Sequence, residues 1–223
     1  MLSIIIPTLN ATNGLAPTIA AVRASKLVSE ILVVDGGSTD GTQECANSLG
    51  AKVIVSQPGR GVQLSMGAED AKSEWLMFLH ADTILELGWS DSVKAFVTAE
   101  GSSSHAGYFR FQLNDRNPWA RWLEKLVARR SNLLGLPYGD QGLLLSRSLY
   151  KNVGGFRRIP LMEDVDMVRR IGRKNLVALD GIAVTSADRY RKSGYLLRMI
   201  KNSFCLSLYF LGASPKFIAK VYK

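Results

Sequence analysis

Carboxylates follow apolar segments of this chain at the points where strands are expected to end. The segment 31–34 is apolar, three of its four side chains are β-branched, and Asp35 follows it directly. Such a run is typical of a parallel strand that is buried on both faces. Because ligands of open α/β sheets bind at the carboxyl ends of the strands, Asp35 is a candidate binding residue. An ordinary turn, in which Asp35 only accepts hydrogen bonds from loop amides, explains the stretch equally well.

The loop after Asp35 is suited to close contact between a ligand and the backbone. Gly36 and Gly37 have no side chains to hold a ligand away. Ser38, Thr39 and Asp40 can cap the helix that follows. The stretch therefore predicts a strand, a tight turn and a helix.

Asp82 stands in a similar position, after the apolar run 75–79. A carboxylate there can hold a hard divalent cation, because Mg²⁺ takes one or two protein carboxylates and completes its shell with phosphate and water. His80 lies two residues earlier, on the same face of an extended chain. It could act as a second ligand or a donor, or only as a polar cap of the strand.

A third acidic group, Glu163-Asp164-Val165-Asp166, opens a predicted helix. Helix dipoles favour acids in the first turn, so this group has a structural explanation. The functional interpretation is a general base close to a phosphate site, which requires hydrogen-bond reach to the proton that is removed.

Strands and helices alternate through the first half, which predicts βαβ units, a parallel sheet and right-handed connections. We expect strands at 2–6, 31–34, 52–56 and 74–79 and helices at 12–29, 42–49 and 62–72. The second half is mixed, with strands at 108–113 and 143–146 and helices at 119–130, 164–171 and 194–211. No G-x-G-x-x-G follows the first strand, which disfavours a dinucleotide-dependent oxidoreductase.

Charge is distributed unevenly along the chain. Residues 1–110 carry a net charge of −4, whereas residues 111–223 carry +13. The second half is therefore expected to meet an anionic phosphate, nucleic acid or membrane surface, unless it is simply a solvated basic face. No nucleic-acid-binding motif accompanies the charge. Two distant cysteines indicate a reduced compartment, and the first residues indicate a strand, not a signal peptide.

The end of the chain is basic and amphipathic. Residues 185–223 contain eight Lys and Arg against one acid, and no stretch reaches the roughly 20 apolar residues of a membrane span. Two interpretations remain open: a helix that lies on a membrane surface, or one that packs on its own domain.

Four motifs in order closely resemble the family 2 glycosyltransferases, which have the GT-A fold. They are Ser3–Asn10, Val34–Thr42, Phe78–Asp82 and Met162–Asp164, and the resemblance covers most of residues 1–175. Three further segments resemble a small bacterial subgroup found beside radical-SAM and selenodomain genes and linked to arsenosugar synthesis. These segments are 59–68, 80–83 and 138–142.

The resemblance implies an α/β fold of the GT-A (nucleotide-diphospho-sugar transferase) type, a Rossmann-like, mostly parallel sheet with helices on both faces. It implies that Asp164 is the base, with Glu163 beside it, and that Asp82, with His80, holds Mn²⁺ or Mg²⁺. The nucleotide-sugar contacts implied are Pro7, Thr8, Asn10, Asp35, Gly36, Arg60, Ala81 and Asp82. The contacts implied for the sugar or acceptor are Tyr138, Gly139, Asp140 and Gln141.

The sequence departs from the family pattern at three positions. Ala11 replaces a frequent Glu, Gly36 replaces the second acid of Asp-Asp-Gly-Ser, and His80 replaces the first acid of Asp-x-Asp. The first two departures leave the donor base open, and the third weakens the metal assignment without removing it.

We therefore expect a single domain over residues 1–223 that transfers a sugar, with inversion, from a UDP- or GDP-sugar to an acceptor hydroxyl. The acceptor would be anionic or lipid-linked, and the protein cytoplasmic, at the inner face of a membrane. Within the domain we expect a nucleotide-sugar half (1–110), an acceptor and catalytic half (111–190) and a basic helical tail (191–223). The alternatives are a nucleotidyltransferase, although Asn10–Gly14 lacks its glycine-rich basic signature, and a degenerate nucleotide-sugar-binding protein at a membrane. A role in nucleic-acid binding is not expected.

Overall fold

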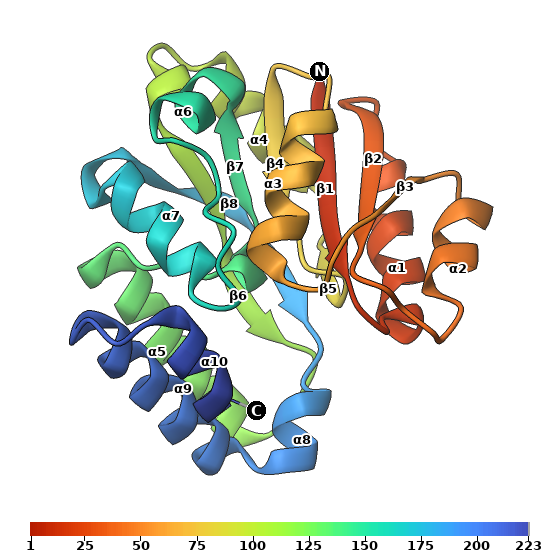
Figure 1. Ribbon diagram of the computed structural model, residues 1–223. Coiled ribbons are helices and arrows are strands. Elements are labelled where there is room, and N and C mark those ends of the chain that lie inside the picture. The colour runs from red at the N-terminus through yellow and green to blue at the C-terminus, as the bar shows by residue number, and fades with distance from the viewer. Residues whose placement is uncertain (223) are drawn as a thin grey trace.

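One twisted sheet of eight strands forms the centre of the computed structural model, which describes residues 1–222 (Figure 1). The strand order is β3-β2-β1-β4-β7-β6-β8-β5, and only β7 and β5 run against the other six. The strands are β1 (Leu2–Thr8), β2 (Val28–Asp35), β3 (Lys52–Val55), β4 (Trp75–Phe78), β5 (Thr83–Leu85), β6 (Ala106–Leu113), β7 (Leu143–Ser146) and β8 (Leu176–Thr185).

Helices cover both faces of this sheet, as the alternating pattern predicted. One face packs against α1 (Thr12–Arg23) and α4 (Trp89–Thr98), and the other against α3 (Arg60–Asp70) and α7 (Glu163–Ile171). The remaining helices are α2 (Thr42–Ser48), α5 (Pro118–Leu134), α6 (Arg147–Asn152), α8 (Asp188–Ser193), α9 (Tyr195–Phe210) and α10 (Pro215–Tyr222). Three short 3-10 turns, η1 (Ser102–Ser104), η2 (Gly139–Gln141) and η3 (Arg173–Asn175), connect them.

The central strands are buried because their side chains are apolar on both faces. Ile4, Ile5 and Ile6 of β1 are inaccessible, and β1 pairs in parallel with β2 and β4. Gly67 lets α3 lie directly on this layer, since a Cβ there would come within 2.5 Å of Ile5 Cγ2. The predicted α/β class, a mostly parallel sheet with helices on both faces, is confirmed.

Several elements differ from the sequence prediction, and two of these differences have a clear physical cause. The helix expected to continue to residue 29 ends at Arg23, because Val28 already pairs with Leu2 in the sheet. The long strand β8 was not predicted, since Asp180-Gly181 in its middle has the composition of a turn. Gly181 instead lies against the ring of Phe109, where a Cβ would be 3.1 Å from Cδ1.

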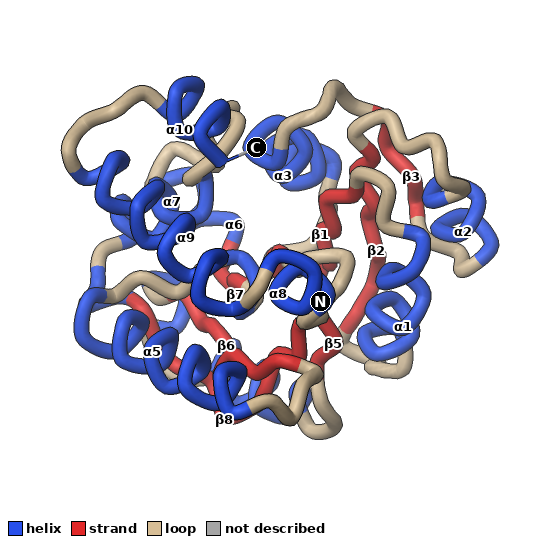
Figure 2. The backbone as a smooth tube through the Cα atoms, turned by 90° about the horizontal axis from the view of Figure 1, so that it is seen from below, coloured by secondary structure: helices blue, strands red, loops and turns tan. Residues whose placement is uncertain are grey.

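Helix α9 packs on α5 and on the end of β6, and α10 packs on α9 (Figure 2). Tyr195 and Met199 of α9 share an apolar cluster with Leu123 and Val127 of α5. Within residues 1–222, none of the helices combines the length and the apolar character that crossing a membrane would require.

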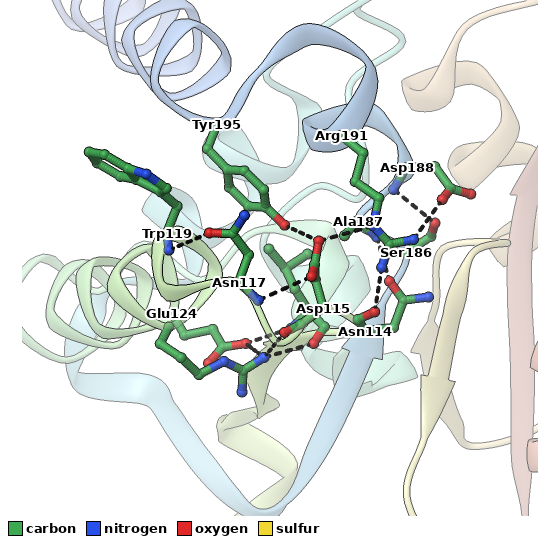
Figure 3. Close-up of polar contacts among 12 residues, drawn as sticks. Asn114, Asp115, Asn117, Trp119, Glu124, Ser186, Ala187, Asp188, Arg191 and Tyr195 are labelled. Atoms are coloured by element: carbon green, nitrogen blue, oxygen red, sulfur yellow. Dashed lines mark hydrogen bonds and ion pairs between the residues drawn. The ribbon is translucent and has the colours of Figure 1, made fainter.

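A polar network fixes α8 and α9 to the end of β6 (Figure 3). Asp115 accepts hydrogen bonds from the Tyr195 hydroxyl, the Arg191 guanidinium and the Asn117 amide. Together these bonds lower the pKa of Asp115 to about 2. The orientation of the first turn of α9 is thereby tied to the sheet.

Candidate active site

Four strands end at the wall of one large cavity of about 660 Å³. The residues at or just after the ends of β1, β4, β6 and β8 that line it are Thr8, His80, Asn114 and Ser186. This is the carboxyl edge of the sheet, where open α/β folds bind their ligands.

Most residues implied as nucleotide-sugar contacts are brought together on this wall. Pro7, Thr8, Asn10, Arg60, Ala81 and Asp82 all line the cavity. The Asn10 carboxamide accepts a hydrogen bond from the Thr39 amide, and the Ser38 hydroxyl accepts one from the Asn10 amide. These bonds join the loop after β1 to the loop after β2.

Asp35 is not among the residues that line this cavity, and its contact with a nucleotide stays a prediction. Its carboxylate is fully buried and accepts bonds from the Gly37 and Ser38 amides, the Thr8 hydroxyl and the Gln43 carboxamide. Burial alone would raise the pKa of Asp35, but the hydrogen bonds lower it, so the carboxylate is ionised. In this structure Asp35 organises the loop, as the simpler sequence interpretation allowed.

Gly36 and Gln141 likewise have positions that were not expected. The space beside Gly36 is filled by Pro58 and by Gln63, whose carboxamide lies 3.3 Å from a Cβ built there. Gln141 is buried, accepts a bond from Ser131 and donates one to the Phe109 carbonyl. Neither residue is among those that line this cavity or the smaller one next to it, so their contacts with substrate stay predictions.

A second cavity of about 120 Å³ adjoins the first. The two share five lining residues: Arg60, His80, Asp82, Ser186 and Arg189. The smaller cavity also contains Tyr138, Asp140, Glu163 and Asp164, the residues implied for the acceptor and for catalysis.

Asp164 is held by backbone amides from two different elements. Its Oδ1 accepts a bond from the Val165 amide at 2.7 Å, and its Oδ2 accepts one from the Gly139 amide at 3.1 Å. Gly139 in turn packs against His80, since a Cβ at 139 would lie 2.4 Å from His80 Nε2. The end of β4, the turn η2 and the start of α7 are therefore fitted together at the smaller cavity.

Glu163 is buried beside Arg60, with Oε1 3.7 Å from Arg60 Nη1. Burial, with Asp164 adjacent, raises the pKa of Glu163 to about 7, although Arg60 opposes the shift. The carboxylates raise the pKa of Arg60 despite its burial, so this side chain is cationic.

Three buried oxygens of the smaller cavity accept no hydrogen bond from the described part of the chain. They are Asp140 Oδ1, Glu163 Oε2 and Asn202 Oδ1. Burial raises the pKa of Asp140 to about 6, helped by Asp164 and Asp82 and opposed by Arg130. Because unsatisfied buried acceptors are unfavourable, the cavity is suited to a ligand that presents hydrogen-bond donors.

The surroundings of Asp82 fit a cation shared with a substrate. Burial and the cations Arg60 and Arg189 lower the pKa of His80 well below its ordinary value, so its imidazole is neutral and able to ligate. Within residues 1–222, no three acidic, His or Cys side chains converge as a preformed metal cluster. One carboxylate and one imidazole suit an ion that takes its other ligands from phosphate and water.

Several lining residues were not singled out from the sequence. Ser186, Arg189 and Lys192 follow β8 and line the larger cavity. Arg198, Asn202 and Tyr222 come from α9 and α10 and line the smaller one. The excess of basic residues indicated that the second half meets an anionic group, but it did not indicate which individual residues line the cavities.

The comparison with known families agrees with this arrangement. The model of glycosyl transferase family 2 matches residues 3–154, the part that contains β1, the loop after β2 and Asp82. The chain belongs to glycosyl transferase family 2.

Curated relatives of this glycosyltransferase are similar over different lengths. A PGL/p-HBAD biosynthesis glycosyltransferase from Mycobacterium bovis is 30% identical over 181 residues, which are 74% of this chain and 67% of the relative. Glycosyltransferase AglJ from Haloferax volcanii is 36% identical over 85 residues, or 37% of this chain and 28% of that protein.

Solved structures confirm the GT-A fold of this glycosyltransferase. Residues 1–349 of TarS from S. aureus superpose with a TM-score of 0.60 at 20% identity, covering 82% of this chain and 57% of that one. Glucosyl-3-phosphoglycerate synthase from Mycobacterium tuberculosis, with Mn²⁺ and UDP-glucose, gives 0.58 at 18% identity, covering 83% and 69%. This chain thus spans little more than half the length of the TarS fragment.

The close approach of Gly139 and His80 generates a first prediction. Gly139→Ala should lower the free energy of unfolding by about 1–3 kcal/mol, because the added methyl overlaps the imidazole. The measurement is urea denaturation in a double-mutant cycle with His80→Ala, which removes the overlapping ring. The loss caused by Gly139→Ala should shrink in the His80→Ala background, and additive effects would contradict the steric explanation.

The raised pKa of Asp140 generates a second prediction, about pH. The folded protein binds the Asp140 proton more tightly than the unfolded chain, so this contribution to stability is complete below about pH 4 and is lost as pH rises through about 6. Asp140→Asn should therefore gain about 1–3 kcal/mol relative to the parent between about pH 4 and pH 7.5. Urea denaturation across this range measures the difference. Asp91→Asn, on the exposed side of α4, is the matched control, and a difference for Asp140→Asn that falls with pH would contradict the assignment.

Proposed function

We propose that this protein transfers a sugar, with inversion, from a nucleoside-diphosphate sugar to an acceptor hydroxyl. The observation that carries the proposal is the wall shared by the two cavities. Asp82 and Arg60 line both, so a donor in the larger cavity would meet an acceptor in the smaller one beside these two side chains.

The base in this proposal is Asp164. The two amides fix its carboxylate in the smaller cavity, where it can accept the proton of an acceptor hydroxyl. As that oxygen forms its bond to the anomeric carbon, the bond from this carbon to the phosphate oxygen breaks on the opposite side. The electron pair leaves with the nucleoside diphosphate, and the proton stays on Asp164.

The leaving diphosphate gains negative charge, which cations on the shared wall would offset. Arg60 provides one such charge within the protein itself. Asp82, with His80, would hold Mn²⁺ or Mg²⁺, which when bound supplies a Lewis acid for the phosphate oxygens. Glucosyl-3-phosphoglycerate synthase was crystallised with UDP and Mn²⁺ or Mg²⁺, which supports this choice of cofactor.

UDP- and GDP-sugars are the proposed donors. The UDP complexes of the fold relative support the first, whereas Gly36 leaves the choice of base open. The proposal also divides the domain into a nucleotide-sugar half (1–110), an acceptor and catalytic half (111–190) and a basic helical tail (191–223). It places the protein in the bacterial subgroup linked to arsenosugar synthesis. The proposed location is the cytoplasm, at the inner face of a membrane.

A catalytically degenerate nucleotide-sugar-binding protein is the second candidate. The observation in its favour is that, among the described residues lining both cavities, only Asp82 and His80 carry a carboxylate or an imidazole for a metal ion. The fixed carboxylate of Asp164 favours the enzyme, because binding alone does not require a base at this position.

The role of Asp164 leads to a third prediction. Asp164→Asn keeps the size of the side chain but removes the base, so the transfer rate should fall by about 10²–10⁴ while nucleotide binding is retained. Product formation from a UDP- or GDP-sugar and binding calorimetry measure the two effects. Asp180→Asn, at an exposed position in β8, is the control. Joint loss of binding and activity would overturn the assignment.

The position of Asp82 leads to a fourth prediction. Asp82→Ala should weaken nucleoside-diphosphate binding in the presence of Mn²⁺ by tenfold or more, on the order of 1.4 kcal/mol, and change it little without metal. Calorimetric titration with and without Mn²⁺ gives both values, with Asp91→Ala as the control. An unchanged metal dependence would remove Asp82 from the cation site.

A further inference from the structure

The outward face of α9 is mostly apolar, with the exposed Ser203 and Ser207 as its polar residues. Tyr195, Met199 and Cys205 face inward, and the opposite side carries large exposed hydrophobic side chains without a Lys, Arg, Asp or Glu among them. Leu197 and Phe204, for example, are 65% and 53% exposed. The exposed hydrophobic residues of this face are Leu196, Leu197, Ile200, Phe204, Phe210 and Leu211. A helix that only covers its own domain normally presents polar residues to solvent.

The neighbouring helix α5 extends this apolar surface. Trp119 and Trp122 of α5 are both about half exposed and stack edge to face, and Figure 3 shows Trp119 directed away from the polar network around Asp115. At the other end of the helix, Leu134 shares an apolar groove with Phe210 and Leu211. Both ribbon views place α5 and α9 side by side (Figures 1 and 2). We call this combined surface of α5 and α9 the α5–α9 face.

Exposed basic residues surround the α5–α9 face. Lys125 and Arg129 lie on α5, and Lys216 and Lys220 lie on α10, which packs against α9. The half of the chain that includes these helices has a net charge of +13. Two copies of so basic a surface would repel each other, whereas an anionic surface is complementary to it.

We propose that the α5–α9 face docks on the surface of an anionic phospholipid bilayer. Leucine, isoleucine and phenylalanine side chains would enter the boundary between headgroups and acyl chains, and the two Trp rings suit the headgroup level. The basic residues would lie against the anionic headgroups. Helix α9 then lies in the plane of the membrane and does not cross it.

In the docked orientation the smaller cavity would lie directly behind α9 as seen from the lipid. Asn202 lines this cavity from α9, and Tyr222 lines it from α10, where its hydroxyl accepts a hydrogen bond from Arg198. We infer that the acceptor hydroxyl is carried by a membrane lipid. This second step rests on the proposed function, whereas docking itself does not.

Co-sedimentation with vesicles tests the docking. The intact protein should bind vesicles of phosphatidylcholine with phosphatidylglycerol much more tightly than vesicles of phosphatidylcholine alone, and salt should weaken the binding. Leu197→Ser combined with Phe204→Ser should reduce partitioning by about tenfold or more, because two exposed apolar side chains are lost. Lys216→Gln combined with Lys220→Gln should reduce the gain from phosphatidylglycerol by about tenfold or more.

Leu87→Ser is the matched control, since Leu87 is fully exposed in the turn between β5 and α4, outside the α5–α9 face. It should sediment like the parent, and circular dichroism should show that every variant is folded. Equal sedimentation of the parent and Leu197→Ser/Phe204→Ser would overturn the proposal. A stable dimer that the same pair of substitutions dissociates, seen by light scattering, would also overturn it, by showing that a second copy covers the face.

Membrane docking and the lipid-borne acceptor can be contradicted separately. Vesicle binding is measured without any donor, so its loss contradicts docking whatever the catalytic activity is. Transfer to water-soluble acceptors, with none to lipid extracts presented in vesicles, would contradict the lipid-borne acceptor and leave the glycosyltransferase function intact. Absence of all transfer together with retained vesicle binding would contradict the proposed function alone.

Discussion

The close contact between His80 and Gly139 determines the geometry of the whole site. The turn η2 can approach the end of β4 only because residue 139 has no side chain. That approach places the Gly139 amide within hydrogen-bond distance of Asp164, at the start of α7. One contact therefore positions three elements relative to one another: the end of β4, the turn η2 and the start of α7. His80 itself lines both the larger and the smaller cavity.

The identity of residue 80 also matters for the charge of this region. Four carboxyl groups, those of Asp82, Asp140, Glu163 and Asp164, already line the smaller cavity. An acid at position 80, as is frequent in the family resemblance, would add a fifth acidic group next to them and raise the pKa values of Asp140 and Glu163 further. A neutral imidazole avoids this repulsion and keeps a nitrogen available to a cation. The departure from the family pattern is thus compatible with a working site, because Arg60 remains the cation that faces Glu163.

The sequence predicted the elements whose side chains are buried on both faces, and it failed where tertiary contacts decide. Strands β1, β2 and β4 each contain an uninterrupted apolar run, at 4–6, 31–34 and 75–78, so these strands follow from composition. Strand β8 contains Asp180-Gly181, and only the Phe109 ring packed against Gly181 explains a strand there. The position of Asp35 at the end of a strand was correctly predicted. Whether its carboxylate faces a ligand or its own loop depends on donors such as Thr8 and Gln43, which lie elsewhere in the sequence.

The acceptor side was the least predictable part of the site, for a physical reason. The larger cavity is built mainly from strand ends and the loops beside them, which motifs mark in the sequence, whereas the smaller one also needs Arg198, Asn202 and Tyr222 from helices that carry no such motif. Helix α9 is held by the Asp115 network and by apolar packing on α5 and β6, while its Leu206 and Tyr209 pack against the cluster that includes α7. Helix α9 therefore contributes both to the cavity that would determine the acceptor and to the α5–α9 face. A change in the outer surface of α9 can alter where the protein docks, while a change on its inner side alters what the smaller cavity accepts.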